Sequence, residues 1–277
     1  FATPKKFEGI FNTIQNNALN SWRGLSTDIE IIIFGNSKGS KEAADEINGE
    51  YIPDVRCSPQ GVPYLSDLFY QAAKISKYPI LAFINADIIL PNNFLAPIPI
   101  IERRFKKFLM VGHRWDMDVE NSVNFHDQKE SEMFWKDAQK KSLKHACTGI
   151  DYFVFRKNSF TNLPDFAIGR PGYDNWMLWN ARRHFIPVID ASNEVMVVHQ
   201  NHDFNFHNLK VDPKIILETD GLMNLKIHQG RTLNLLDANY HLSNGKIEKK
   251  KSREFINRNL GKLPIIFQEF SLFFNYL

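Results

Sequence analysis

The chain has 277 residues, 43% of them hydrophobic, and a formal net charge of +3 at pH 7. This composition supports a sizeable globular core, and the weak, scattered positive charge argues against a nucleic acid partner. No apolar run reaches the roughly 18 to 20 residues that span a bilayer, and the two cysteines lack the spacing of a disulfide framework or a zinc site.

The first part of the chain alternates predicted helices with predicted strands. Apolar residues at helical spacing predict a helix over residues 7–19, and two more helices are expected after turns, over residues 40–47 and 64–76. Short apolar runs predict strands over residues 30–34, 51–57 and 80–90. This alternation predicts an α/β fold with a mostly parallel central sheet flanked by helices.

The second part of the chain continues the pattern less regularly. We expect strands over residues 108–112, 152–155 and 195–198, and helices over 92–107, 174–184, 253–260 and 264–277, the first of them interrupted by Pro97 and Pro99. The polar region 118–144 predicts a helical excursion or a loop over the edge of the sheet. We therefore expect one domain over residues 1–205, with a donor half (1–115) and an acceptor half (116–205), and a mainly helical C-terminal extension over 206–277.

Asp87 is the single charged residue in the apolar run 80–90. A carboxylate buried without a partner costs several kcal/mol or becomes protonated. We expect Asp87 near the carboxyl end of a strand, where open α/β sheets bind ligands. The sequence thus predicts either a metal ligand near a substrate phosphate or a structural carboxylate that caps the next helix.

Four motifs in a fixed order give the chain a resemblance to a known family. They are Gly35-Asn36 after a buried strand, Asn85-Ala-Asp87 after a second strand, Gly172-Tyr-Asp174 at a helix start, and the late His199. Together they resemble the GT-A glycosyltransferases, particularly the family-2-like group, over roughly residues 1–205. The resemblance implies an enzyme that transfers a hexosyl or related sugar from a nucleotide-diphosphate donor, of the UDP or GDP type, to a hydroxyl of a glycan or other acceptor.

The resemblance also implies a divalent cation. Asp87 matches the metal-binding carboxylate of the family's Asp-x-Asp motif, His199 matches a late metal ligand, and Asn85 replaces the first carboxylate but can bond a ribose hydroxyl or a metal-bound water. Imidazole with carboxylate and phosphate oxygens favours Mn²⁺, with Mg²⁺ as second choice. One carboxylate fewer predicts metal binding that depends on the nucleotide, and metal-free catalysis stays open. His202 is either a further ligand or an exposed or capping histidine.

On the acceptor side, the resemblance implies that Asp174 is the base of an inverting reaction, although a carboxylate at a helix start is also a common cap. Asp151 is expected to hold a hydroxyl or to serve as substitute base. Trp115, Tyr173 and Trp176 either stack on a sugar or belong to the core. Inversion is favoured over retention, which the sequence does not exclude.

The donor side is expected to use residues at the first strand ends. The resemblance places Thr3 and Pro4 along the nucleobase and Asn36 facing it, while Asp67 is within reach of the ribose or base. Arg114 and Arg170 are either phosphate clamps or members of surface ion pairs.

Two other functions fit parts of this pattern. A nucleotidyltransferase would carry a glycine-rich basic loop after the first strand, which the sequence 3–7 lacks. A non-catalytic carbohydrate- or nucleotide-binding module of GT-A fold would explain Asn85. The joint presence of Asp87, Asp174 and His199 favours the enzyme.

The expected location follows from the lack of an apolar spanning run. We expect a cytoplasmic protein or one peripheral to the cytoplasmic side of a membrane, and the missing initiator Met fits an excised piece of a longer polypeptide. The basic run 249–253 is either a solvated helix start or a membrane-surface or partner contact.

Overall fold

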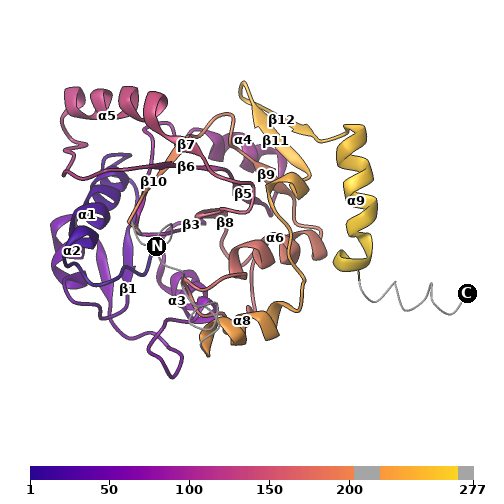
Figure 1. The fold of residues 1–277 in the computed structure, drawn as a ribbon, viewed down its shortest axis with the longest axis horizontal. Helices are drawn as coiled ribbons and strands as arrows, with labels where there is room; N and C mark the ends of the chain where they lie inside the picture. The colour runs from indigo at the N-terminus through magenta and orange to yellow at the C-terminus, as the bar shows by residue number, and fades with distance from the viewer. Residues whose placement is uncertain (203–218, 268–277) are drawn as a thin grey trace, which may run out of the picture.

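The computed structural model describes residues 1–202 and 219–267 (Figure 1). Its helices are α1 (Ile10–Arg23), α2 (Ser40–Glu46), α3 (Leu65–Ile75), α4 (Pro97–Arg104), α5 (Gln128–Lys141), α6 (Tyr173–Arg183), α8 (Asp220–His228) and α9 (Arg253–Ile266), with a 3₁₀ turn η1 (Leu235–Asp237). Its strands are β1 (Ile32–Phe34), β2 (Glu50–Ile52), β3 (Ile80–Ile84), β4 (Ile88–Ile89), β5 (Leu109–Val111), β6 (Arg114–Met117), β7 (Leu143–Lys144), β8 (Tyr152–Arg156), β9 (Val188–Asp190), β10 (Val197–Gln200), β11 (Tyr240–Ser243) and β12 (Lys246–Lys249).

The central sheet has the order β12-β11-β9-β5-β8-β3 and is extended at β3 by the first residues of the chain. The amide of Ile84 donates to the carbonyl of Phe1, and the amide of Phe34 donates to that of Ala2. Residues 1–2 thus join β3 to the parallel pair β1–β2. This arrangement brings the carboxyl ends of β1, the segment 1–2 and β3 to one edge of the sheet.

The predicted α/β class, with helices flanking a mostly parallel central sheet, is confirmed, although two of its strands, β8 and β12, run in the opposite direction. Strand β8 lies antiparallel to both β3 and β5, whereas β5, β9 and β11 run parallel to one another. Short apolar runs identify buried strands without giving their direction, so the reversal at β8 has no sequence signal.

Both faces of the central sheet are buried, as the nearly continuous apolar strands predict. Along β3, Leu81 and Phe83 join a cluster with residues of α3 and α6, while Ile84 joins a cluster with residues of α1, α2 and α4. The helices therefore form one layer on each side of the sheet.

The predicted strand over residues 80–90 is wrong in one respect that matters for the site. The chain leaves the central sheet after Ile84, turns through Asn85-Ala-Asp87, and enters a second sheet as β4. This sheet has the order β4-β10-β6-β7, with β10 antiparallel to β4 and parallel to β6. Asp87 consequently lies in a turn between two sheets.

The expected helices overlap the observed ones, with two adjustments. Pro97 and Pro99 do not interrupt a helix but stand in the first turn of α4, where no amide hydrogen bond is needed. The expected helix 253–260 is part of α9, which continues past Pro264 to Ile266, and the rest of the expected helix 264–277 lies beyond the described residues apart from Phe267.

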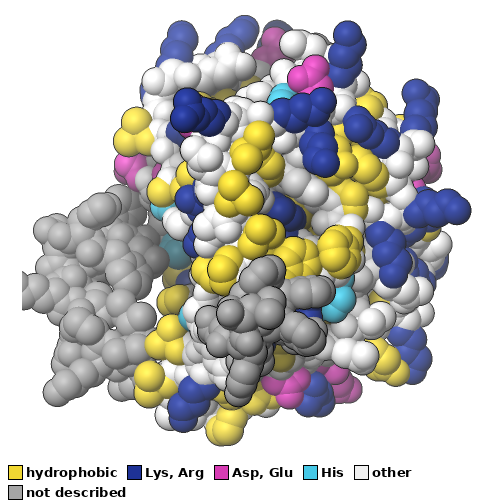
Figure 2. Space-filling model, turned by 90° about the vertical axis from the view of Figure 1, so that its right-hand side faces the viewer, with side chains coloured by type: hydrophobic (Ala, Val, Ile, Leu, Met, Phe, Trp, Pro, Cys, Tyr) yellow, Lys and Arg dark blue, Asp and Glu magenta, His cyan; other side chains and the backbone are white. Residues whose placement is uncertain are grey.

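The C-terminal part of the chain contains α8 and α9, as a mainly helical extension would, and also two strands that were not predicted. Residues 240–249 form a hairpin, and β11 joins the central sheet by pairing with β9. The hairpin turns at Asn244 and Gly245, which both have a positive φ. An Asn-Gly pair is a sequence signal for such a tight turn. The predicted domain boundary at residue 205 lies outside the described residues. Figure 2 shows the face of the molecule that carries α9.

Candidate metal and nucleotide site

A polar cavity of about 610 Å³ opens at the carboxyl ends of β1, the segment 1–2 and β3. The predicted site residues that line it are Thr3, Pro4, Asn36, Asn85, Asp87, Arg114, Asp151 and His199. His202, Lys5 and Arg170 also line it. The fold thus brings together residues that are up to 199 positions apart in the sequence.

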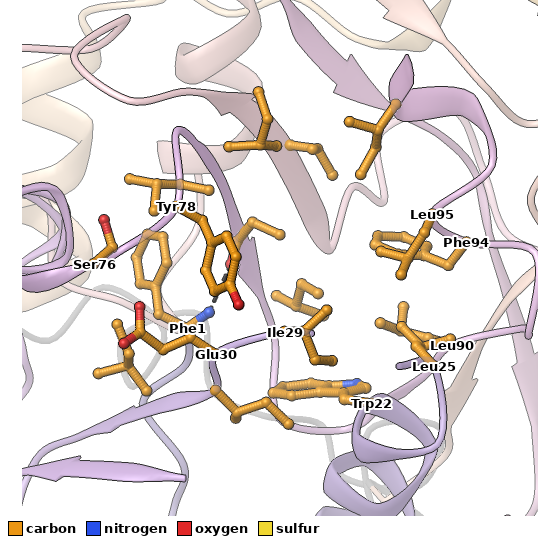
Figure 3. A pocket seen from close by; sticks show the side chains of 18 of the residues that line it. Phe1, Trp22, Leu25, Ile29, Glu30, Ser76, Tyr78, Leu90, Phe94 and Leu95 are labelled. Carbon is orange, nitrogen blue, oxygen red and sulfur yellow. Dashed lines mark hydrogen bonds between the residues drawn. The ribbon is translucent and has the colours of Figure 1, made fainter. Parts of the chain in front are cut away.

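A second, apolar cavity of about 230 Å³ lies at the amino ends of β1 and β3 (Figure 3). Trp22, Tyr78 and Phe94 are among its lining side chains. Among the described residues that line it, its two acidic residues, Asp28 and Glu30, are accompanied by no histidine or arginine. This cavity therefore offers fewer groups for a cation or a phosphate than the polar cavity does.

Asp87, His199 and His202 form a cluster with metal-binding potential. One ligand atom from each lies within 4.8 Å of the other two. Oδ2 of Asp87 is 3.2 Å from Nε2 of His202 and 3.7 Å from Nε2 of His199. The interpretation of His202 as an exposed residue is wrong, because only 10% of its side chain is exposed.

Strand pairing and one buried glutamine hold this cluster in place. His199 lies opposite Asp116 in β6 and opposite Ile88 in β4. The fully buried Gln200 donates its side-chain amide to the carbonyls of Asp87 and Ile14, at 3.1 and 2.7 Å. The turn that carries Asp87 is therefore tied both to β10 and to helix α1.

The environment of Asp87 fits a cation. Burial acts to raise the pKa of Asp87, but the hydrogen bond from His202 and the charges of His199 and Arg114 outweigh it, so the pKa lies below its ordinary value. Its Oδ1 atom is buried and has no hydrogen-bond partner among the described residues. An orphaned carboxylate oxygen beside two imidazoles is a donor set suited to Mn²⁺ and similar ions.

Asp116, which was not predicted as a site residue, lies within ion-pair distance of three basic side chains around the cluster. Its Oδ1 lies 3.1 Å from Nδ1 of His199 and 3.0 Å from Nε of Arg114, and its Oδ2 pairs with Nδ1 of His145. Burial acts to raise the pKa of Asp116, yet these partners hold it well below its usual range. The alternation of a strand, which puts Arg114 and Asp116 on one face of β6, is the signal that could have indicated it.

Arg114 connects this group to Asp151. Its Nη1 lies 3.0 Å from Oδ2 of Asp151, while Nδ2 of Asn85 donates to Oδ1 of the same carboxylate at 2.7 Å. Oδ1 of Asn85 accepts a 3.3 Å bond from the hydroxyl of Tyr173. Both oxygens of Asp151 and both polar atoms of the Asn85 side chain are therefore engaged within the protein.

Asp174 lies in the first turn of α6, after Gly172, whose positive φ of 102° and contact with the His228 ring suit glycine. Burial raises the pKa of Asp174 to about 6, helped by the charge of Asp151 and opposed by the amide of Asn175. Asp174 does not line the polar cavity. Its role as base stays a prediction, and its raised pKa is the property such a base needs.

Other predicted site residues are placed as follows. Asp67 does not line the cavity. Its Oδ2 accepts hydrogen bonds from the backbone amide of Arg56 and from the side-chain amide of Gln71. Tyr173 and Trp176 are buried in the core, which agrees with the expectation that they are core residues and not a sugar-stacking surface. Trp115 does not line the cavity. The donor-binding role of Asp67 stays a prediction.

The cysteines and the membrane prediction can be compared with the structure directly. Cys57 and Cys147 are both free thiols. Within residues 1–202 and 219–267, no helix has both the length and the apolar character needed to cross a membrane.

Comparison with known proteins gives structural matches. No protein-family model and no curated protein matches the sequence. Glucosyl-3-phosphoglycerate synthase from Mycobacterium tuberculosis, in complex with Mn²⁺, UDP and glucosyl-3-phosphoglycerate, is 12% identical with a TM-score of 0.46, over 90% of this chain and 85% of that chain. The same enzyme with Mn²⁺, UDP-glucose and phosphoglyceric acid is 12% identical with a TM-score of 0.47, over 83% and 78%.

Proposed function

We propose that the chain is a glycosyltransferase that moves a sugar from a nucleotide-diphosphate donor to an acceptor hydroxyl with the help of a divalent cation. The observation that carries the proposal is Asp87. Its buried, unpartnered Oδ1 stands beside His199 and His202 in a polar cavity at the carboxyl ends of three neighbouring strands. This is the edge of an open α/β sheet where ligands bind.

Asp87, His199 and His202 would hold the cation, and the two imidazoles favour Mn²⁺ over Mg²⁺. When bound, the cation would offset the negative charge of the departing diphosphate. Because the protein offers one carboxylate and two neutral ligands, the phosphates of a donor would complete the coordination. Metal affinity should therefore rise when the nucleotide is present.

Two cations of the chain are placed to contact the donor phosphates. Arg170 and Lys5 line the cavity, and neither forms an ion pair within residues 1–202 and 219–267. Arg114 already pairs with Asp116 and Asp151, so it orients these carboxylates. Thr3, Pro4 and Asn36, on the adjoining strand ends, would contact the nucleoside of a UDP or GDP donor.

Asp174 is the proposed base of an inverting reaction. Its carboxylate would accept the proton of the acceptor hydroxyl while the hydroxyl oxygen bonds to the anomeric carbon and the bond to the diphosphate breaks. Asp151 is the weaker candidate, because Arg114 and Asn85 occupy both of its oxygens. A pKa of about 6 leaves Asp174 mostly ionised at neutral pH and still able to take up a proton.

The test is release of nucleotide diphosphate from UDP- and GDP-sugars in the presence of Mn²⁺, with and without a chelator. We expect chelator-sensitive release with at least one donor, and none from Asp87→Asn. Tight nucleotide binding without release would point instead to a binding module. Formation of pyrophosphate from a nucleoside triphosphate and a sugar phosphate would point to a nucleotidyltransferase.

A further inference from the structure

The net positive charge of the chain is concentrated in the C-terminal hairpin and helix. Residues 246–263 contain seven Lys or Arg and two Asp or Glu, a net charge of +5, whereas the whole chain carries +3. The remaining residues therefore sum to −2. Such an asymmetry is a property of a surface that contacts an anionic partner.

Several of these cations are available for a partner. Lys246, Lys249, Lys251 and Arg253 are exposed and form no ion pair with any described residue. Lys250 is different, since it pairs with Asp190 inside the protein. Figure 2 shows Lys and Arg side chains gathered on the face that carries α9.

Beside these cations, α9 presents an apolar stripe. Ile256, Leu260 and Leu263 are 48%, 60% and 43% exposed, and Phe267 follows at the end of the helix. Their spacing of i, i+4, i+7 and i+11 puts all four on one face of the helix. Hydrophobic side chains appear on this face in Figure 2.

An exposed aromatic residue enlarges the stripe. Phe185, after the end of α6, is 79% exposed and has a positive φ of 57°, a backbone conformation unfavourable for an aromatic residue. Its ring stacks on that of Phe267 with centroids 5.5 Å apart. We call Phe185, Ile256, Leu260, Leu263 and Phe267 the α9 stripe.

The opposite face of α9 is fixed to the protein. Arg258 forms an ion pair with the buried Asp237, Arg182 bonds Asn259 at 2.8 Å, and the indole of Trp179 donates to the carbonyl of Ile265 at 2.7 Å. The helix is therefore held with its apolar stripe directed outward.

We infer that the α9 stripe and the neighbouring cations dock the protein on a lipid bilayer that contains anionic lipids. A basic amphipathic helix lies in the plane of such a surface, with its apolar face among the acyl chains and its cations near the headgroups. A second copy of the chain fits the face less well, because a symmetric contact would bring the unpaired cations of both copies together. This inference does not depend on the proposed glycosyl transfer.

Flotation of the full chain with lipid vesicles tests it. We expect binding to phosphatidylcholine vesicles that contain phosphatidylglycerol, little binding to phosphatidylcholine alone, and loss of binding as salt is added. Leu260→Gln combined with Leu263→Gln should weaken binding about tenfold or more. Replacing Lys249, Lys251 and Arg253 with Gln should weaken it by about fivefold for each charge removed.

Leu143→Gln is the matched control, since Leu143 is 75% exposed but lies on β7, and it should bind vesicles like the wild type. Absence of binding to anionic vesicles, or unchanged binding by the double leucine variant, would overturn the inference. It would equally be overturned if light scattering showed a dimer that the double leucine variant converts to a monomer.

Discussion

Nδ1 of His199 lies 3.1 Å from Oδ1 of Asp116, a contact set by the pairing of β10 with β6. A neutral imidazole that donates from Nδ1 carries its lone pair on Nε2, which here faces Asp87. The negative charge of Asp116 beside Nδ1 thus favours the tautomer and the ring orientation that a metal ligand needs, as carboxylates beside metal-bound histidines commonly do.

Asp116→Asn should therefore weaken Mn²⁺ binding by about 10- to 100-fold without removing a ligand. Calorimetric titration of Mn²⁺ in the presence of UDP or GDP would measure the change. The control is Asp118→Asn, which removes the same charge from an exposed position two residues away. Equal affinities of wild type and Asp116→Asn would show that Asp116 does not orient His199.

His202 provides a separate test of the cation site. His202→Gln should weaken Mn²⁺ binding about as much as His199→Gln, because both Nε2 atoms lie near Oδ2 of Asp87. His126, an exposed histidine that does not line the polar cavity, supplies the control His126→Gln, which should bind Mn²⁺ normally. A His202→Gln variant with wild-type affinity would reduce the site to two protein ligands.

Asp174→Asn should leave donor binding intact and lower turnover by orders of magnitude, because it removes the proposed proton acceptor. Comparison with Asp151→Asn separates the two carboxylates, since loss of Asp151 should disturb Arg114 and Asn85 and so affect donor binding as well. Initial rates and donor affinity should be measured for both variants. Near-normal turnover of Asp174→Asn would exclude it as the base.

The same substitution has a predicted effect on stability. The pKa of Asp174 is about 6 in the folded protein and 3.8 in its unperturbed state, so the folded form binds the proton more tightly. Stability therefore falls as pH rises from about 4 to about 6, by up to about 3 kcal/mol at about 1.4 kcal/mol per pKa unit. Urea unfolding should show Asp174→Asn to be more stable than wild type near pH 8, with a smaller difference near pH 4. A constant difference across this range would contradict the raised pKa.

Gln200→Leu should destabilise the fold by about 1 to 3 kcal/mol, because it leaves the buried carbonyls of Ile14 and Asp87 and the amide of Asn17 with fewer partners. Urea unfolding measures this cost, with the exposed Gln139→Leu as control. Metal affinity should fall too, since Gln200 holds the turn of Asp87. Unchanged stability and affinity would show that β4 and β10 alone position this turn.

The sequence was most informative where local patterns decide structure. Local residue patterns predicted α1, α2, α3 and α6, and the lone carboxylate Asp87 in an apolar run correctly directed attention to the edge of the sheet. Thr3, Asn36 and Asn85, which the resemblance to GT-A glycosyltransferases assigned to the donor side, all line this cavity. These features depend on residues close together in the chain.

The parts that were missed depend on pairing between distant segments. Asp116 meets His199 only because β6 pairs with β10 in one register, and no local pattern gives that register. The direction of β8 likewise depends on its neighbours β3 and β5. The hairpin at Asn244-Gly245 is an exception, because its turn signal was present in the sequence.

The central claim is that a nucleotide and a divalent cation bind together at Asp87. Its most direct test is the melting temperature of wild type and Asp87→Asn with UDP, GDP, CMP or dTDP, each with and without Mn²⁺. We predict that one diphosphate, UDP or GDP, raises the melting temperature of the wild type when Mn²⁺ is present, with little effect of either alone and no joint effect on Asp87→Asn. A wild-type protein that no nucleotide stabilises, or an Asp87→Asn variant stabilised equally, would contradict the claim.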